Sequence, residues 1–362
     1  MLEDGTTFDG FSFGRFIVSP IVGEVVFNTG MVGYTETMTD PSYAGQLLCF
    51  TYPLIGNYGV PEYIRDEYDI LKNFESTRIQ TKGIIANRFS KDPSHYQNSK
   101  TISAWMDQEG VSGIEGVDTR ELTIHLRETG VMLGAIGTTF TEAKHALENA
   151  QEYSSINFCE QVSTRRPIVY GKNVKGRVAL IDCGVKLNIV RNLVARGFEV
   201  TVLPFATKFE VIENQFSGVV ISNGPGDPKN CKPAVDLARC VVDAELPILG
   251  ICLGTQIIAL SQGADTFKLK YGHRGQNKPC LDLKTGRCLV TSQNHGYSVS
   301  EDSLASTKLE PWFVNADDKT LEGLIHTSKP CLSVQFHPEA SPGPVDASYV
   351  FDAFAEKILK AS

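Results

Sequence analysis

The chain has 362 residues, which is too long for one average domain and suits two domains that each bury a hydrophobic core. Its composition, 42% hydrophobic and 21% charged, is typical of globular proteins, and its net charge of −8 argues against a nucleic acid partner. No apolar run approaches the roughly 20 residues that cross a bilayer, and no secretory signal pattern follows Met1. We therefore expect a cytoplasmic protein with no membrane partner.

Short β-rich runs dominate the first part of the chain. Strands are predicted at residues 13–19, 24–28 and 46–51, where β-branched and aromatic residues gather. Helical spacing follows at residues 119–129 and 141–152. This half is predicted to be a compact α+β domain, mostly β at first.

The character of the chain changes near residue 150. Polar stretches that contain Gly and Pro, among them Arg165-Arg-Pro and Gly171-Lys-Asn, are typical of a linker or a long connection. We therefore place an N-terminal domain at residues 1–150, a linker at 151–175 and a second domain at 176–362.

Strands and helices alternate after this linker. A continuous apolar run at residues 178–181 suits a strand buried on both faces, and a helical pattern at 187–196 stops at Gly197. Such alternation predicts an α/β domain with a doubly wound, mostly parallel sheet, in which ligands bind beyond the carboxyl ends of the strands. Further strands are predicted at 200–203, 218–222 and 247–251, and further helices at 234–243 and 350–359.

The segment Gly250-Ile-Cys252-Leu-Gly254 joins a predicted strand to a predicted helix. A sharp turn of this kind strains the backbone of its central residue, and side chains at the flanking glycines would clash. It also places Cys252 at a helix N-terminus, where the macrodipole favours the thiolate. Cys252 is therefore the candidate nucleophile. The other eight of the nine cysteines are interpreted as small buried hydrophobes of a reducing compartment.

A predicted strand at residues 331–336 runs into His337-Pro-Glu339. A thiolate nucleophile needs an imidazole that takes and returns protons, and the imidazole needs a carboxylate that fixes its tautomer. His337 and Glu339 can supply both groups to one pocket. Four other histidines are interpreted as ordinary surface or core residues: His95, His125, His145 and His326.

The loop Ser222-Asn-Gly224-Pro-Gly226-Asp-Pro228 follows another predicted strand, and its Gly-Pro-Gly turn exposes backbone N–H groups. Together, this loop, the segment around Cys252 and the His337-Pro-Glu339 run resemble the signature of the class I, triad-type glutamine amidotransferases. The resemblance implies that Cys252 is the nucleophile, that His337 is the acid and base, and that Glu339 orients His337. It also implies an oxyanion hole formed by the N–H groups of Gly224 and Leu253.

Other segments resemble the small subunit of carbamoyl-phosphate synthetase. The N-terminal domain favours this family, because other class I amidotransferases lack it, and the resemblance covers essentially the whole chain. It implies that a flavodoxin-like amidotransferase domain follows the small-subunit N-terminal domain. The matching segments are residues 23–34, 39–43, 51–59, 116–120, 271–279 and 291–297.

The same resemblance implies a pocket for L-glutamine, whose carboxylate and ammonium groups suit hydroxyl, amide and backbone partners. Ser42 in this pocket implies a site to which both domains contribute. One position departs from the family, since its synthetases usually carry His where this chain has Thr255. The implied pocket residues are Ser42, Gly224, Gly226, Leu253, Gln256, Asn294, Gly296 and Tyr297.

The implied reaction is hydrolysis of L-glutamine to glutamate and ammonia through a γ-glutamyl thioester on Cys252. A synthetase large subunit, or a fused synthetase domain, would use the ammonia with ATP, magnesium and bicarbonate to form carbamoyl phosphate. We expect the product to serve pyrimidine synthesis, with arginine synthesis as the alternative. No Walker-type loop is present, so no cofactor or metal is expected in this chain. Two alternatives stay open: the glutaminase of another synthase, and a docking or regulatory subunit with little turnover.

Overall fold

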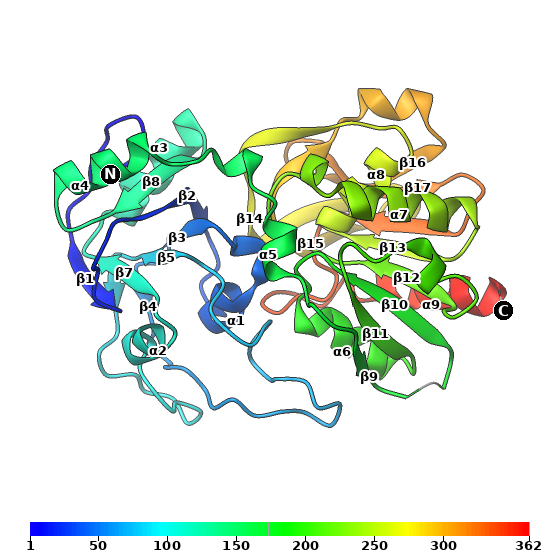
Figure 1. The fold of residues 1–362 in the computed structure, drawn as a ribbon, viewed down its shortest axis with the longest axis horizontal. Coiled ribbons are helices and arrows are strands. Elements are labelled where there is room, and N and C mark those ends of the chain that lie inside the picture. The colour runs from blue at the N-terminus through cyan, green and yellow to red at the C-terminus, as the bar shows by residue number, and fades with distance from the viewer. Residues whose placement is uncertain (173, 362) are drawn as a thin grey trace. The chain divides into compact units, whose positions relative to one another are not determined.

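The computed structural model describes residues 1–172 and 174–361. Asn173, inside the predicted linker, and Ser362, at the end of the predicted second domain, lie outside the described residues. The chain forms two compact units (Figure 1). The first unit comprises Met1–Ile64 and Leu71–Ile156, and the second comprises Arg65–Ile70 and Asn157–Ser362.

The strands of the first unit are β1 (Phe11–Gly14), β2 (Ile21–Asn28), β3 (Gln46–Phe50), β4 (Leu54–Ile55), β5 (Gly83–Ile85), β6 (Arg88–Phe89), β7 (Ser112–Glu115) and β8 (Met132–Ile136). Six of them form one sheet in the order β1-β7-β5-β3-β2-β8, while β4 pairs with β6. The pairs between β2, β3, β5 and β7 are parallel, and both edge pairs are antiparallel. The central β3 strand is buried along its whole length, as a strand covered on both faces should be.

Helix caps explain where the helices of the first unit begin. Asp118 accepts a hydrogen bond from the N–H of Glu121, and Thr139 accepts one from the N–H of Glu142. The predicted helix at 119–129 is confirmed, whereas the predicted helix at 141–152 ends early, at Glu148, with Asn149 as its C-cap. The helices are α1 (Tyr34–Thr39), α2 (Ile102–Gln108), α3 (Thr119–Thr129) and α4 (Phe140–Glu148), with short 3₁₀ turns at η1 (Pro41–Tyr43) and η2 (Tyr153–Ser155).

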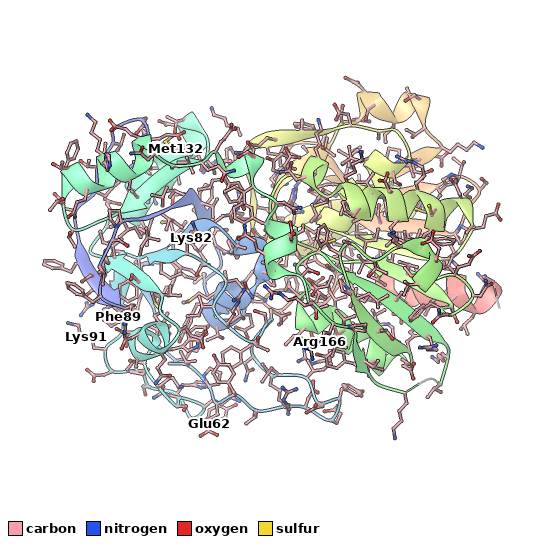
Figure 2. All side chains as sticks on the ribbon, in the orientation of Figure 1. Glu62, Lys82, Phe89, Lys91, Met132 and Arg166 are labelled. Carbon is pink, nitrogen blue, oxygen red and sulfur yellow. The ribbon has the colours of Figure 1, made fainter. Side chains whose placement is uncertain are left out.

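The predicted strand at residues 13–19 is only partly correct. The β1 strand ends at Gly14, whose φ of 73° turns the chain away from the sheet. Phe13 still packs inside the unit, where its ring lies 4.7 Å from that of Phe89, labelled in Figure 2. Phe16 and Val18 are exposed, so the apolar run continues beyond the strand without being buried.

The strands of the second unit are β9 (Ile168–Tyr170), β10 (Arg177–Asp182), β11 (Glu199–Pro204), β12 (Gly218–Ile221), β13 (Ile248–Ile251), β14 (Thr266–Asp282), β15 (Cys288–Val299), β16 (Leu309–Asn315), β17 (Leu321–His326) and β18 (Cys331–Val334). They form one sheet in the order β15-β14-β16-β17-β18-β13-β12-β10-β11-β9. The pairs that join β11, β10, β12, β13 and β18 are all parallel, as the sequence predicts. Antiparallel strands, which the sequence pattern did not reveal, extend the sheet at both edges.

Helices cover both faces of the parallel strands. The longer helices are α6 (Leu187–Ala195), α7 (Lys232–Asp243), α8 (Leu253–Ser261) and α9 (Tyr349–Ala361), and shorter ones are α5 (Phe158–Val162), η3 (Phe209–Val211), η4 (Pro228–Asn230) and η5 (Asp302–Ser306). Along β10, Val178 and Leu180 pack with α6 and α9, while Ala179 and Ile181 pack with α7 and α8. Figure 1 shows α6 and α7 on opposite sides of this sheet. The unit is therefore a three-layer α/β fold.

Two segments differ from the predicted domain division. Within the predicted linker at 151–175, Phe158 of α5 is buried and β9 pairs with β11, so much of this stretch belongs to the second unit. The segment Arg65–Ile70 also belongs to the second unit, since Ile70 is fully buried in its core and Asp66 pairs with Arg191 at 2.6 Å. Among the described residues, no helix combines the length and the apolarity needed to cross a membrane.

The contact of α9 with the sheet gives a test of the second unit's core. Phe354 is fully buried, so Phe354→Ala should lower the free energy of unfolding by about 3–5 kcal/mol through lost burial and the cavity left behind. Leu359→Ala removes an apolar side chain from the same helix, but Leu359 is 55% exposed, and its loss should cost less than about 0.5 kcal/mol. Urea unfolding of the two variants and the parent chain measures the difference. Similar losses for both variants would contradict this packing of α9.

Candidate active site

The turn between β13 and α8 holds Cys252 in a strained backbone conformation, with φ 54° and ψ −103°. Its glycines allow close packing. A Cβ atom on Gly254 would lie 2.2 Å from the carbonyl oxygen of Ile221, and one on Gly250 would lie 2.6 Å from the carbonyl oxygen of Gly254. No larger residue fits at either position without moving the backbone, which is the reason that the sequence analysis gave for the two glycines.

The sulfur of Cys252 lies in a buried polar environment. The residue is only 2% exposed, and its thiol donates to the carbonyl oxygen of Asn294 at 3.7 Å. The side-chain Nε2 of Gln335 lies 3.7 Å from the same sulfur and donates to it. Sγ therefore has one acceptor and one donor beside it.

The Gly224 loop lies against the start of α8. A Cβ atom on Gly224 would lie 2.2 Å from the carbonyl oxygen of Cys183 and 2.8 Å from Cδ2 of Leu253, so glycine is required there as well. Leu253 is the first residue of α8, where a helix leaves its N–H groups without partners inside the helix. Gly226, with φ 88°, turns the chain back into the loop. The predicted oxyanion residues Gly224 and Leu253 are therefore neighbours.

His337 and Glu339 lie just after β18, and both are 2% exposed. The backbone N–H of His337 donates to the carbonyl oxygen of Ser292 at 2.9 Å, which ties this loop to β15. Nδ1 of His337 lies 2.6 Å from Oε1 of Glu339 and donates its proton there, so the other nitrogen, Nε2, is left for proton exchange. Nε2 is buried and has no hydrogen bond to any of the described residues.

A lysine that the sequence analysis did not select completes this group. Nζ of Lys186, a residue that is 3% exposed, lies 3.0 Å from Oε1 of Glu339 and donates to the carbonyl oxygen of Ala340. Burial alone would raise the pKa of Glu339, but the charges of Lys186 and His337 hold it at about 2. Burial would lower the pKa of His337, but Glu339 and Cys252 raise it to about 10. The carboxylate is thus held ionised between two cations.

Three of the predicted glutamine-pocket residues meet beside Cys252. Nε2 of Gln256 donates to the carbonyl oxygen of Tyr297 at 2.9 Å, and Asn294 supplies the carbonyl that accepts from the thiol. Gly296 lies between Asn294 and Tyr297 on β15. Gln256 also donates to Oε1 of Gln335 at 3.0 Å. Gln335 is the second residue of this site that the sequence analysis did not select.

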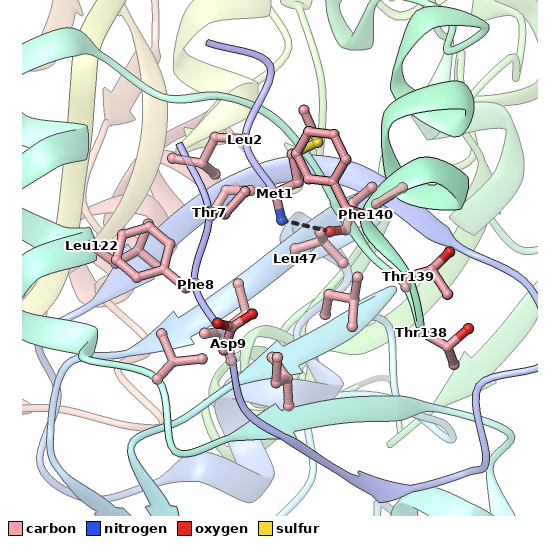
Figure 3. A pocket seen from close by; sticks show the side chains of 18 residues that line it. Met1, Leu2, Thr7, Phe8, Asp9, Leu47, Leu122, Thr138, Thr139 and Phe140 are labelled. Carbon is pink, nitrogen blue, oxygen red and sulfur yellow. Dashed lines mark hydrogen bonds between the residues drawn. The ribbon is translucent and has the colours of Figure 1, made fainter. Parts of the chain in front are cut away.

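Ser42 lies in the first unit, unlike the other predicted site residues. It is part of η1, and its N–H donates to Oδ1 of Asp40 at 2.9 Å in a buried turn. Its contribution to a glutamine pocket stays a prediction. The first unit also contains a cavity of about 200 Å³ near Leu47 and Phe140 (Figure 3), and none of the predicted site residues lines it.

A separate buried cluster joins β14, β15 and β17. His273 lies 2.8 Å from Asp318 and 3.3 Å from Glu322, and His295 lies 3.7 Å from Glu322. The ligand atoms of His273, His295 and Glu322 lie within 4.8 Å of one another, so these three residues could hold a cation. Burial would lower the pKa of His273, but the two carboxylates raise it. A proton on His273 therefore offsets part of the charge of the two carboxylates.

The cysteines differ from the prediction at two positions. All nine are free thiols, and seven are buried, including Cys252. Cys240 on α7 and Cys288 on β15 are exposed, because each occupies a side of its element that faces away from the core. These two therefore do not pack as core hydrophobes, whereas the other six outside Cys252 are buried.

The pairing of Lys186 with Glu339 makes stability depend on pH. A carboxyl with a lowered pKa stabilises the fold above its ordinary value of 4.5, and this contribution is lost as the pH falls toward about 2. Lys186→Met removes the cation and raises the pKa of Glu339. It should lower the free energy of unfolding at pH 7 by about 3 kcal/mol, and by less as the pH falls below about 4.5.

Urea unfolding of the parent chain and the variant between pH 3.5 and pH 8 measures this difference. Lys229→Met is the matched control, since its partner Asp265, at 2.8 Å, and Lys229 itself are largely exposed. This control should change the free energy of unfolding by less than about 1 kcal/mol. A loss with Lys186→Met that is equally large at every pH would show that its charge does not act on Glu339.

Comparisons with known proteins connect this geometry to a family. The family model of class I glutamine amidotransferases matches residues 179–357, and the model of the carbamoyl-phosphate synthase small chain, CPSase domain, matches residues 1–136. The chain is thus similar to one family over its second unit and to another over most of its first.

Curated relatives match over nearly the whole chain. The arginine-specific small chain of carbamoyl phosphate synthase from Chaetomium globosum is 48% identical, covering 99% of this chain and 77% of the relative. The proteins of the same name from Neurospora crassa and Saccharomyces cerevisiae are 48% and 46% identical, each covering 99% of this chain and 79% and 88% of the relative. With a class I amidotransferase domain of the glutamine-hydrolysing type in its second unit, this chain belongs to the carbamoyl phosphate synthase small-chain family.

Proposed function

We propose that this chain hydrolyses L-glutamine to glutamate and ammonia and delivers the ammonia to a carbamoyl phosphate synthase large chain. The observation that carries the proposal is the buried set of Cys252, His337 and Glu339, in which a 2.6 Å hydrogen bond fixes the imidazole tautomer. The strained turn at Cys252 supports it, because such turns expose a nucleophile at the end of a strand.

In the proposed reaction, the thiolate of Cys252 adds to the carboxamide carbon of glutamine. The backbone N–H groups of Gly224 and Leu253 stabilise the oxyanion, and loss of one such donor typically costs about 10²–10³ in rate. His337 gives a proton from Nε2 to the leaving ammonia, and Glu339 keeps Nδ1 protonated throughout. His337 then takes a proton from the water that hydrolyses the γ-glutamyl thioester.

The remaining pocket residues would bind the amino acid end of the substrate. Gln256, Asn294 and Tyr297 already meet near Cys252, and Gly296 leaves the backbone of β15 accessible beside them. Gly226 keeps the oxyanion loop turned toward α8. We also propose Ser42 as a substrate-binding residue.

For the product, we propose carbamoyl phosphate for arginine synthesis. The relatives' names say "arginine-specific", which favours this pathway over the pyrimidine synthesis expected from the sequence. The large chain would use ATP, magnesium and bicarbonate, and this chain would need no cofactor of its own. Its nine free thiols fit a reducing compartment, and we propose the cytoplasm.

Replacing the nucleophile tests the proposal directly. In the complex with a large chain, ATP and bicarbonate, Cys252→Ser should lower glutamine-dependent carbamoyl phosphate formation by about 10⁴-fold or more. Synthesis from added ammonia should stay unchanged, because that route bypasses the thiol. Cys240→Ser, which alters an exposed thiol on α7, is the control and should leave both rates unchanged.

Two outcomes would overturn the proposal. Glutamine-dependent synthesis that survives Cys252→Ser would show that another group hydrolyses glutamine. A parent chain that hydrolyses no glutamine, alone or with the large chain, would indicate a docking or regulatory subunit.

A further inference from the structure

Gln335 lies in the site without a role in the chemistry described so far. It follows the last residue of β18, is fully buried, and donates its backbone N–H to the carbonyl oxygen of Glu322 at 2.8 Å. Its side chain makes two contacts, one with Sγ of Cys252 and one with the side chain of Gln256. It therefore connects the nucleophile to the substrate pocket.

The hydrogen-bond network fixes which way the Gln335 amide points. Nε2 of Gln256 can only donate, and it donates to Oε1 of Gln335 at 3.0 Å and to the carbonyl oxygen of Tyr297 at 2.9 Å. Because Oε1 of Gln335 must accept, its Nε2 is the atom that faces Sγ of Cys252 at 3.7 Å. The opposite orientation would place two donors against each other at Gln256.

The imidazole of His337 also faces Cys252, whose charge raises the pKa of His337, so a thiolate has a cationic partner there. The two amide groups beside the sulfur favour different protonation states. The carbonyl oxygen of Asn294 accepts a hydrogen bond from the thiol, but it has no hydrogen to donate to a thiolate. The amide of Gln335 donates, and a hydrogen bond donated to an ionised group favours the ionised form. When the thiol loses its proton, the contact with Gln335 becomes the stronger one.

The same amide determines which atom Gln256 presents to the substrate. Both hydrogens of the Gln256 amide are used by Gln335 and Tyr297. The polar atom that remains is the acceptor Oε1, which suits an ammonium group. A rotated Gln256 would instead present a donor, which an ammonium group cannot use.

We propose that Gln335 is a further functional residue of this reaction, which stabilises the thiolate of Cys252 through Nε2 and positions Gln256 for the substrate ammonium through Oε1. The inference rests on the proposed function, since it assigns to Gln335 a part in activating that nucleophile. It also accounts for Gln335 in the run Gln335-Phe-His337, which the catalytic set leaves unexplained.

Two substitutions separate the two contacts. Gln335→Met keeps a similar volume but removes both the donor and the acceptor. Gln335→Glu keeps an oxygen that can accept from Gln256, but places a negative charge where the donor to Cys252 was. If Gln335 only fills space, Gln335→Met, which keeps the volume, should leave the ionisation of Cys252 as it is in the parent chain.

The first measurement is the rate of alkylation of Cys252 by iodoacetamide as a function of pH, in the full chain, with the modified residue identified by mass spectrometry. The pH of half-maximal rate should rise by about 1 unit in Gln335→Met and by about 2 units in Gln335→Glu. If Gln335 donates to the thiolate, the pH of half-maximal rate should be lowest in the parent, higher in Gln335→Met and highest in Gln335→Glu. A profile for Gln335→Met that is identical to the parent's would overturn this part of the inference, even if Gln335→Glu shifts it through its own charge.

The second measurement is the KM for glutamine in the complex with the large chain. Gln335→Met should raise KM by about 3–10-fold, since Gln256 loses an acceptor, whereas Gln335→Glu should change it by less than about twofold. Equal KM changes in both variants would overturn the positioning role. Gln46→Met removes another buried amide, paired with Glu24 at 2.9 Å, and controls for stability by urea unfolding.

The outcomes separate this inference from the proposed function. If Cys252 is alkylated selectively but Gln335→Met does not change its pH profile, the role of Gln335 is contradicted. The proposed reaction is not contradicted by that result. A parent chain whose Cys252 reacts no faster than the exposed Cys240 and Cys288 would instead contradict the activation of Cys252 itself.

Discussion

The close approach of the start of α8 to the ends of β12 and β13 is the constraint on which the site depends. At Gly254 the distance is so short that a Cβ atom would lie 2.2 Å from the carbonyl oxygen of Ile221. This approach places the N–H of Leu253 beside Gly224 and forces Cys252 into its strained conformation. The strain is held because β13 is a central strand with parallel neighbours on both sides. A less rigid sheet would allow the turn to relax and the sulfur to move.

A buried ion pair and a backbone hydrogen bond join the loops after β10, β12 and β18 into one site. The side chain of Lys186, at the start of α6, pairs with Glu339 after β18, and its backbone N–H donates to Oδ1 of Asn223 after β12 at 3.1 Å. A buried ion is costly unless it is paired, and here each ion has a partner within 3.0 Å. The orientation of His337 therefore depends on Lys186, which lies 151 positions earlier in the chain. This explains how a loop without regular secondary structure can hold a base in one orientation.

The sequence predicts those features that a local pattern encodes. Neighbouring residues alone predict a strand from the apolar run at 178–181 and a sharp turn from the glycines around Cys252. The structure has β10 and a strained turn at these places. Lys186 and Gln335 have no such local signal, because their partners are distant in sequence. A charged residue in the loop after a buried strand, as Lys186 is after β10, was the available hint. The antiparallel strand β9 was hidden for a similar reason, since its pairing with β11 depends on a polar segment folding back.

Thr255, the one departure from the family pattern noted in the sequence, is explained by its place in the turn. It is 1% exposed, its N–H donates to the carbonyl oxygen of Cys252 at 3.0 Å, and its hydroxyl donates to that of Gly250 at 3.4 Å. Both bonds close the turn upon itself and leave no donor directed at His337. Thr255 therefore supports the backbone that holds Cys252. It does not take a proton from the Cys252 thiol. These contacts strengthen the turn on which a reactive Cys252 depends.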